Sequence, residues 1–236
     1  SPSNREEQVF FDTNGPTFNG FKLSFLKRVL ASPHRPELEK ELGAQAFSLW
    51  ERFVASFDPC IAEEKRSAAA TVTRYSELMA SIRVDFRGKE YNLSKMRAFA
   101  GHSDRATRRE AAQATDKAFT AHQSELDSLF EELVQLRHAM ALKMGFENYI
   151  PLGYSSLYRT DYGAQDVEAF RAQVLEVVVP LATRIRERRA QALGVTDYAL
   201  HDEHVRDSLG VPKPCGDHDW MMEQASDMFE SMGEDF

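Results

Sequence analysis

The sequence has 236 residues, of which 42% are hydrophobic and 28% are charged, and it carries a formal net charge of −8. These proportions are ordinary for a globular protein, and the acidic balance argues against a nucleic-acid surface, which needs a basic stripe. Cys60 and Cys215 are far apart and form no CxxC pattern, so the sequence predicts neither a disulfide framework nor a thiolate zinc cluster. We therefore expect a cytoplasmic protein, and no stretch is long and apolar enough to predict a membrane helix.

The N-terminal part of the chain predicts helices. Asn14-Gly15-Pro16 is a turn signal, so residues 1–18 are expected to form an irregular lead-in. Asp58-Pro59 is expected to end a helix, because proline cannot continue one. Apolar residues at helical spacing predict three helices, over residues 21–30, 37–57 and 61–80.

The pattern of apolar and polar residues changes at Ile82. Apolar and polar residues alternate through IRVDFRGKEYNL, around the turn Arg87-Gly88-Lys89. Alternation on both sides of a glycine turn predicts a small β-hairpin at about residues 82–91. It is the one convincing strand signal, so the fold class is mainly α.

The strongest helical periodicity lies between Ser103 and Gly145. Thr107 and Glu110 have the spacing of a capping box, and Gly145 is expected to end the helix in a left-handed conformation. A single rod of this length is long for an ordinary domain, so we consider a break near Gln123-Ser124.

Residues 146–163 form a tyrosine-rich connection. We interpret Tyr154, Tyr158 and Tyr162 as packing residues in preference to channel-facing ones, because buried aromatic residues mostly serve cores. A further apolar stripe predicts a helix that Pro180 bends and Gly194 ends, wrapping the core. The last helix is expected from about Asp217, with a methionine stripe that packs into the core.

The segment HDEHVRD, residues 201–207, resembles a rearranged zinc motif. A helical zinc site needs two histidines four residues apart, but His201 and His204 are three apart. The segment also lies between a helix stop and the Gly-Pro-rich residues 210–214, where helical spacing does not apply. We interpret it as a polar connector and keep a metal site at these histidines as a testable alternative.

Other chemical patterns are incomplete. None of the seven histidines follows a glutamate by three residues, which excludes the di-iron bundle pattern, and the sequence has no phosphate-binding loop or nucleophile elbow. Cys60 follows a proline at a helix start, where a thiol pKa can fall, but no catalytic partner is in sight. The residue chemistry therefore assigns no catalytic, cofactor-binding or metal-binding residue.

An ordered series of short motifs nevertheless resembles the oligoendopeptidase F proteins of the thimet oligopeptidase-like zinc metallopeptidases. The match is good over residues 82–236 and weak over 1–81, and DFRGKEYNLSKMRAFAGHSDRATRREAAQA, residues 85–114, is similar to the family's hairpin and following helix. The central motifs are carried by Leu133, Val134, Arg137, Ala141, Gly145, Phe146, Asn148, Tyr149, Leu152, Gly153, Tyr154, Arg159, Asp161, Tyr162, Val167, Phe170, Arg171, Val179, Pro180 and Leu181.

The resemblance implies a multi-helix channel wall of the neurolysin and thimet oligopeptidase type, with zinc held by an HExxH helix and a later glutamate. That helix is expected beyond Phe236, so no zinc ligand or catalytic residue is transferred to this chain. The resemblance further implies two regions, N-terminal helices over 1–81 and, over 82–236, part of a larger peptidase domain.

Two functions follow as hypotheses. The first is the N-terminal part of a zinc-dependent oligoendopeptidase, which shapes the channel for short unfolded peptides and is inactive without its C-terminal catalytic portion. The second is a non-catalytic helical interaction module that reuses the fold. In either case we expect no nucleic-acid or membrane partner. A channel wall that lacks the C-terminal portion is expected to expose apolar surface and to self-associate.

Overall fold

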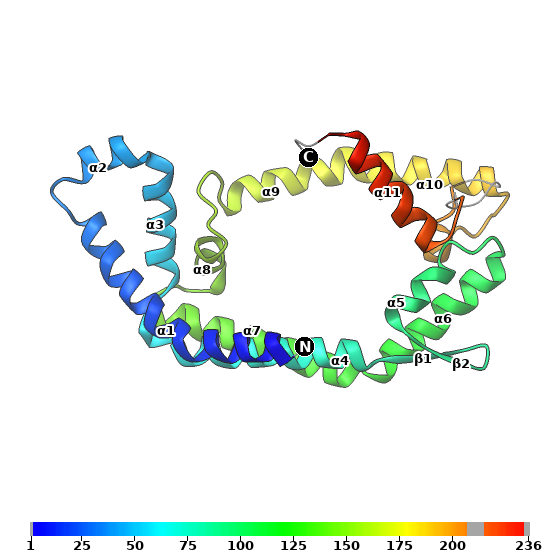
Figure 1. Ribbon diagram of the computed structural model, residues 1–236, viewed down its shortest axis with the longest axis horizontal. Helices are drawn as coiled ribbons and strands as arrows, with labels where there is room; N and C mark the ends of the chain where they lie inside the picture. Colours follow the sequence, from blue (N-terminus) through cyan, green and yellow to red (C-terminus); the bar gives the residue numbers. More distant parts are fainter. Residues whose placement is uncertain (1, 207–214, 234–236) are drawn as a thin grey trace. The chain divides into compact units, whose positions relative to one another are not determined.

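A computed structural model describes residues 2–206 and 215–233, with only the backbone described for residues 2–13 and 16. The described chain is mainly helical with one antiparallel β-hairpin, which confirms the predicted fold class (Figure 1). It divides into two compact units, Ser1–Ile82 with Ala118–Leu181, and Arg83–Lys117 with Ala182–Phe236. These units are defined by how densely their residues contact one another. They do not test the predicted division of the chain into residues 1–81 and 82–236, which stays a prediction.

The elements, in chain order, have the following bounds. The helices are α1 Pro2–Leu30, α2 Arg35–Leu42, α3 Ala44–Ser56, α4 Ala62–Ser81, α5 Leu93–Met96, α6 Arg105–Ala121, α7 Gln123–Lys143, α8 Tyr149–Ser156, α9 Ala164–Gln173, α10 Val179–Leu193 and α11 His218–Ser231. The strands are β1 Arg83–Phe86 and β2 Lys89–Asn92. Short 3-10 helices lie at η1 Pro59–Ile61, η2 Arg97–Phe99 and η4 Leu200–Asp202, and η3 Val174–Val178 is a π-helical segment.

Two predictions for the N-terminal helices are wrong. The expected irregular lead-in is helical, because α1 continues through Asn14-Gly15-Pro16. A proline inside a helix removes one backbone hydrogen bond. The free energy gained when a helix packs on its neighbours can outweigh this loss and the local preference of the residues for a turn. The single helix predicted over 37–57 is two helices, because Gly43 has φ of +93° and breaks it between α2 and α3.

Two apolar clusters lie among the described side chains of the first unit. Leu23 and Leu26 of α1 pack against Phe53 of α3 and against Phe57, with Trp50 and Val54 at the edge. The second cluster joins η1, α7 and α8 through Ile61, Met140, Ala141 and Leu152. Apolar residues from separate helices supply the main favourable free energy of folding when they are removed from water together.

The second unit contains the hairpin, whose predicted position is confirmed. Val84 pairs with Tyr91 and Phe86 with Lys89, so Val84 and Phe86 lie on the same face of the sheet. Both side chains are buried, and the Phe86 ring meets the ring of Phe99 with centroids 4.8 Å apart. The exposed positions of β1 alternate with these two, which is the pattern that predicted the hairpin.

The long periodic segment is confirmed as two helices with a break at His122, next to the break considered from the sequence. The expected cap at Thr107 is wrong, because Asp104 accepts the backbone N–H of Thr107 at 2.9 Å and so caps α6 one turn earlier. The stop at Gly145 is confirmed. Gly145 has φ of +81° and donates to Leu142 O, and Phe146 donates to Ala141 O, which together form a Schellman motif.

The helix that was predicted to bend at Pro180 has a widened turn directly before the proline. Val179 donates its N–H to Val174 O, five residues back, so η3 is a π-helical segment between α9 and α10. A π segment directly before the proline relieves the collision between its ring and the carbonyl four residues earlier.

The apolar stripe of this helix does not pack into a core as predicted. Phe170, Leu175, Val177 and Leu181 are exposed, and so are Met221, Met228 and Met232 of the predicted methionine stripe. Helical periodicity in the sequence identifies an apolar face, but it does not say whether the chain supplies the surface that covers it. Among the described residues, no helix is long and apolar enough to cross a membrane.

Candidate functional site

The segment 201–206 is anchored by a buried carboxylate. Asp202 lies in the short turn η4 and its side chain is 0% exposed. Arg105 and Arg108, one turn apart on α6, reach it from the same helix face. Arg105 Nη2 donates to Asp202 Oδ2 at 2.9 Å, and Arg108 Nη2 donates to Oδ1 at 2.8 Å. We call Arg105, Arg108, Asp197 and Asp202 the Asp202 cluster.

The guanidinium of Arg108 donates four hydrogen bonds inside the fold. Its Nε donates to His201 O at 3.0 Å, and its Nη1 donates to His102 O at 2.9 Å. Arg105 spans both carboxylates, since its Nη1 donates to Asp197 Oδ1 at 2.8 Å. Burial opposes ionisation of Asp202, but the hydrogen bonds from Arg105 and Arg108 outweigh it and hold the pKa of this carboxyl well below its usual range.

The geometry assigns Asp202 to the arginines. Both of its oxygens accept guanidinium hydrogen bonds, and Oδ2 also accepts the N–H of Ala199 at 3.1 Å. His201 Nε2 lies 3.7 Å from Asp202 Oδ2, and His204 is exposed. Among the side chains that the structure describes, in residues 14–15, 17–206 and 215–233, no group of three or more His, Cys, Asp and Glu is placed to hold a metal ion, and Asp207 lies outside the described residues.

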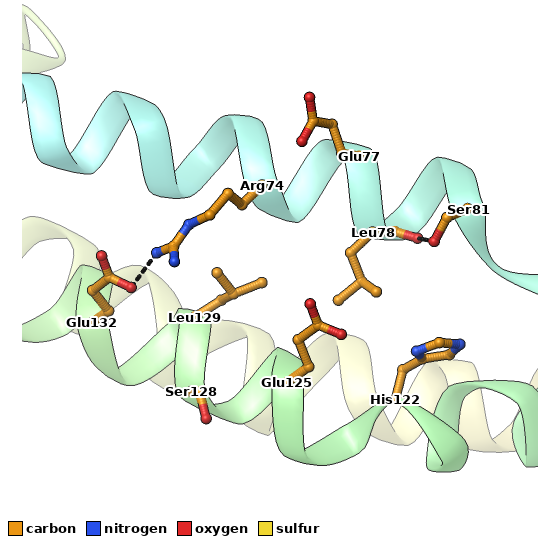
Figure 2. Close-up of a pocket in the computed structure, with 9 residues that line it drawn as sticks. All are labelled: Arg74, Glu77, Leu78, Ser81, His122, Glu125, Ser128, Leu129 and Glu132. Carbon is orange, nitrogen blue, oxygen red and sulfur yellow. Dashed lines mark hydrogen bonds and ion pairs between the residues drawn. The ribbon is translucent and has the colours of Figure 1, made fainter.

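A second polar site lies in a groove between α4 and α7 (Figure 2). Arg74 of α4 reaches across the groove and pairs with Glu132 of α7, while Leu78 and Leu129 lie between the two helices. The hydroxyl of the buried Thr71 donates to Glu132 Oε1 at 2.8 Å. The hydrogen bonds from Thr71 and then Arg74 lower the pKa of Glu132, so the carboxylate stays ionised.

This groove is a helix-packing seam. Its one arginine is already paired with an acid, and its floor is formed by leucines that belong to the helix contact. Glu77 points away from α7 in Figure 2. The arrangement therefore explains how α4 and α7 are held together, and it offers no free cation to an anionic ligand.

A third site lies where the chain leaves α8 and enters α9. It is a cavity of about 490 Å³ lined by Arg159, Tyr162, Asp166, Val167, Phe170 and Arg171, which we call the Arg159 pocket. The guanidinium carbon of Arg159 lies 4.5 Å from the ring centroid of Tyr154 and 5.4 Å from that of Tyr162. Tyr154 and Tyr162 thus pack against Arg159 and against each other, with centroids 6.5 Å apart.

The thiol of Cys60 has no chemical activation. Desolvation raises the pKa of this thiol, and the hydrogen bond and charge of Asp58 raise it further. The lower pKa that was considered for a cysteine after Pro59 is therefore not found. Its Sγ lies 3.9 Å from Lys143 O. A raised pKa reduces the thiolate fraction, which is the nucleophilic form.

Comparisons with known proteins agree with one another. The model of the peptidase M3 N-terminal domain matches residues 2–57. A solved structure described as an oligoendopeptidase F is 36% identical over 99% of this chain, with a TM-score of 0.90. Pz peptidase A, solved with an inhibitor, is 34% identical over 99% of the chain, with a TM-score of 0.89. The chain belongs to the oligoendopeptidase F / M3 peptidase family.

A third solved structure, described as an oligoendopeptidase F from Bacillus anthracis str. Ames, is 33% identical over 98% of the chain with a TM-score of 0.86. The chain spans 41% or 42% of the length of these three structures. No curated protein matches the chain. The M3 relatives are peptidases by name, so the segment described here is part of a peptidase-family protein.

Residue patterns alone missed the pairing of the Asp202 cluster. Arg105 and Arg108 stand three apart in the segment that resembles the family's S-x-D-R-x-x-R helix, and that spacing places them on one face of a helix. It did not indicate Asp202 as their common partner. The sequence likewise gave no sign that the Arg74–Glu132 pair would bridge α4 and α7.

Proposed function

We propose that this chain is the N-terminal part of a zinc-dependent oligoendopeptidase that hydrolyses peptide bonds in short unfolded peptides. The similarity to oligoendopeptidase F structures over 98–99% of the chain, together with coverage of only 41–42% of theirs, carries the proposal. In this proposal the segment shapes the substrate channel, and the zinc ligands belong to a C-terminal catalytic portion. No catalytic step is assigned to the side chains that the structure describes, among which no three or more His, Cys, Asp and Glu are placed to hold a metal ion.

The exposed apolar residues of η3, α10 and α11 support the presence of a further portion. Leu175 is 69% exposed, and Val177 and Leu181 follow it along the same helical run. Met222, Met228 and Phe229 of α11 are also exposed. Solvent-exposed apolar side chains that gather on a helix mark a surface for another polypeptide segment. We propose that the C-terminal catalytic portion covers them.

The test compares the complete protein with the 236-residue chain. A fluorogenic peptide of about eight residues is the probe, and bound zinc is measured by inductively coupled plasma mass spectrometry. The complete protein is expected to hydrolyse the peptide, to bind one zinc ion and to lose activity with 1,10-phenanthroline. Hydrolysis by the 236-residue chain alone, or zinc-independent hydrolysis by the complete protein, contradicts the proposal.

The association state of the 236-residue chain tests whether the C-terminal portion covers this apolar surface. The 236-residue chain is expected to self-associate in analytical ultracentrifugation, whereas the complete protein is not expected to do so through this surface. Leu175→Glu and, separately, Met228→Glu are each expected to weaken self-association, because each side chain is exposed and a charge buried in an apolar contact loses its hydration. If the complete protein lacks an HExxH segment and peptidase activity, the helical interaction module becomes the better explanation.

A further inference from the structure

The Arg159 pocket has the composition of a carboxylate-binding site. Two of its lining residues are arginines, one is an acid, and the rest are aromatic or aliphatic. Among the described residues, no carboxylate forms an ion pair with the guanidinium of Arg159 or of Arg171. Two unpaired guanidinium groups at one cavity are unusual for a chain with a formal charge of −8, in which acids outnumber basic residues.

The end of α8 fixes the position of Arg159. Tyr158 donates its N–H to Ser155 O and Arg159 donates to Tyr154 O, which is a Schellman motif with tyrosine in place of the usual glycine. Tyr158 therefore adopts φ of +53°, a left-handed conformation that costs a non-glycine residue about 1–2 kcal/mol. The strained turn brings Arg159 back over the ring of Tyr154. Such strain often marks a functional position.

Among the described residues, no acceptor takes a hydrogen bond from the side-chain N–H groups of Arg159, so these donors are open to a ligand. A guanidinium presents its N–H groups in a planar fork. That fork matches the two oxygens of a carboxylate. The single acid of the pocket, Asp166, forms no ion pair with either arginine, and its Oδ2 accepts the N–H of Gly163 at 2.8 Å.

The helix α9 supplies the rest of the pocket. Val167 and Arg171 are four residues apart, and so are Asp166 and Phe170, so these four side chains share one side of the helix. Phe170 is largely exposed and lines the pocket together with the two arginines. A ligand that fits this surface carries a carboxylate next to an apolar side chain.

We propose that the Arg159 pocket binds the C-terminal carboxylate of a peptide substrate, with Phe170 and Val167 contacting an apolar side chain of its last residue. The proposal rests on the proposed peptidase function and identifies which end of the peptide this segment holds. A carboxylate from an aspartate or glutamate in another part of the complete protein has the same chemistry, and the experiment separates the two sources.

The experiment uses the complete protein and two fluorogenic peptides that differ only at the C-terminus, one ending in phenylalanine with a free carboxylate and the other in phenylalanine amide. Arg159→Gln is expected to raise the KM for the acid peptide about tenfold or more, because a bidentate charge-assisted hydrogen bond is lost. The KM for the amide peptide and the kcat for both are expected to stay unchanged. Arg159→Lys keeps the charge without the fork, so an intermediate KM is expected.

Two further variants sharpen the result. Arg171→Gln is expected to act in the same direction with a smaller effect, since Arg171 is exposed on α9. Arg28→Gln, an exposed arginine of α1, removes the same charge far from the pocket in sequence and is expected to change neither KM. Equal KM values of the wild-type protein for the two peptides, or an equal loss for both in Arg159→Gln, overturns the proposal. The second result indicates an internal carboxylate as the occupant.

A direct measurement separates this inference from the proposed function. If the complete protein hydrolyses neither peptide, the peptidase proposal fails, and the pocket is tested on the 236-residue chain with N-acetyl-phenylalanine and its amide. The arginine Nε–Hε resonances in nitrogen-15 spectra are the readout. A shift of the resonance that Arg159→Gln removes, with the acid and not with the amide, supports the carboxylate site, and no shift with either compound rejects it.

Discussion

Two pairs of arginines in this chain differ in what satisfies their guanidinium groups. Arg105 and Arg108 are neutralised by Asp202 and Asp197, and the donors of Arg108 are used inside the fold. Arg159 instead rests on two tyrosine rings, and neither it nor Arg171 pairs with a carboxylate among the described residues. A buried guanidinium with internal acceptors serves stability, whereas a stacked guanidinium at an open cavity keeps its binding capacity.

The largest expected effect comes from Asp202→Asn. The substitution leaves the buried Arg108 without its anionic partner, and breaking a buried ion pair on one side costs about 3–5 kcal/mol of unfolding free energy. Urea denaturation followed by circular dichroism measures it. Asp197→Asn is the control, because Asp197 is 66% exposed and such a pair contributes less than about 1 kcal/mol. Equal losses in both variants contradict the distinction between a buried and an exposed partner.

The stability gap between the wild-type chain and Asp202→Asn is expected to depend on pH. The folded-state pKa of Asp202 is lowered, so the unfolded chain binds more protons in acid and the contribution of the carboxylate is lost there. The contribution is complete above about pH 4, the ordinary pKa of an aspartate. The gap in denaturation midpoint should be constant from pH 7 to pH 5 and should narrow below about pH 4. A gap that is unchanged at pH 3 argues against an ionised Asp202.

The turn that positions Arg159 provides a smaller effect of opposite sign. Tyr158→Gly removes the cost of a left-handed tyrosine and is expected to raise the unfolding free energy by up to about 1 kcal/mol. Gly145→Ala, at the same position of the Schellman motif of α7, is expected to lower it by about 1 kcal/mol. A Cβ at Gly145 meets no atom within 4 Å, so that cost comes from the backbone conformation. Thermal unfolding measures both, and a destabilised Tyr158→Gly shows that the tyrosine side chain outweighs the strain.

The smallest expected effect on stability is that of Arg159→Gln. The substitution removes cation–π contacts at a partly exposed site, which are worth about 0.5–1 kcal/mol. Arg108→Gln, the same change in the Asp202 cluster, is expected to cost several times more. Parallel urea titrations measure the unfolding free energy of the two variants. A large loss in Arg159→Gln would mean that the Arg159 pocket is built for stability rather than for binding.

Local signals in the sequence predicted the elements whose conformation is decided by a few neighbouring residues. The hairpin followed from alternation around Gly88, and the end of α7 followed from Gly145, because glycine adopts a left-handed conformation without steric cost. The ordered family motifs identified the family from residues 82–236, and the model of its N-terminal domain matches residues 2–57, where those motifs were weak. The same kind of signal failed at Asn14-Gly15-Pro16, where the chain continues as helix.

The sequence by itself determined a mainly helical chain with one hairpin and membership in a peptidase family. Only the tertiary structure decided that Asp202 is the partner of Arg105, 97 positions away, and that Arg159 folds back onto two tyrosines. It also decided that the apolar stripe around Phe170 is exposed. The physical reason is that periodicity and turn residues act over one or two turns, whereas ion pairing and burial depend on which distant segments meet in space.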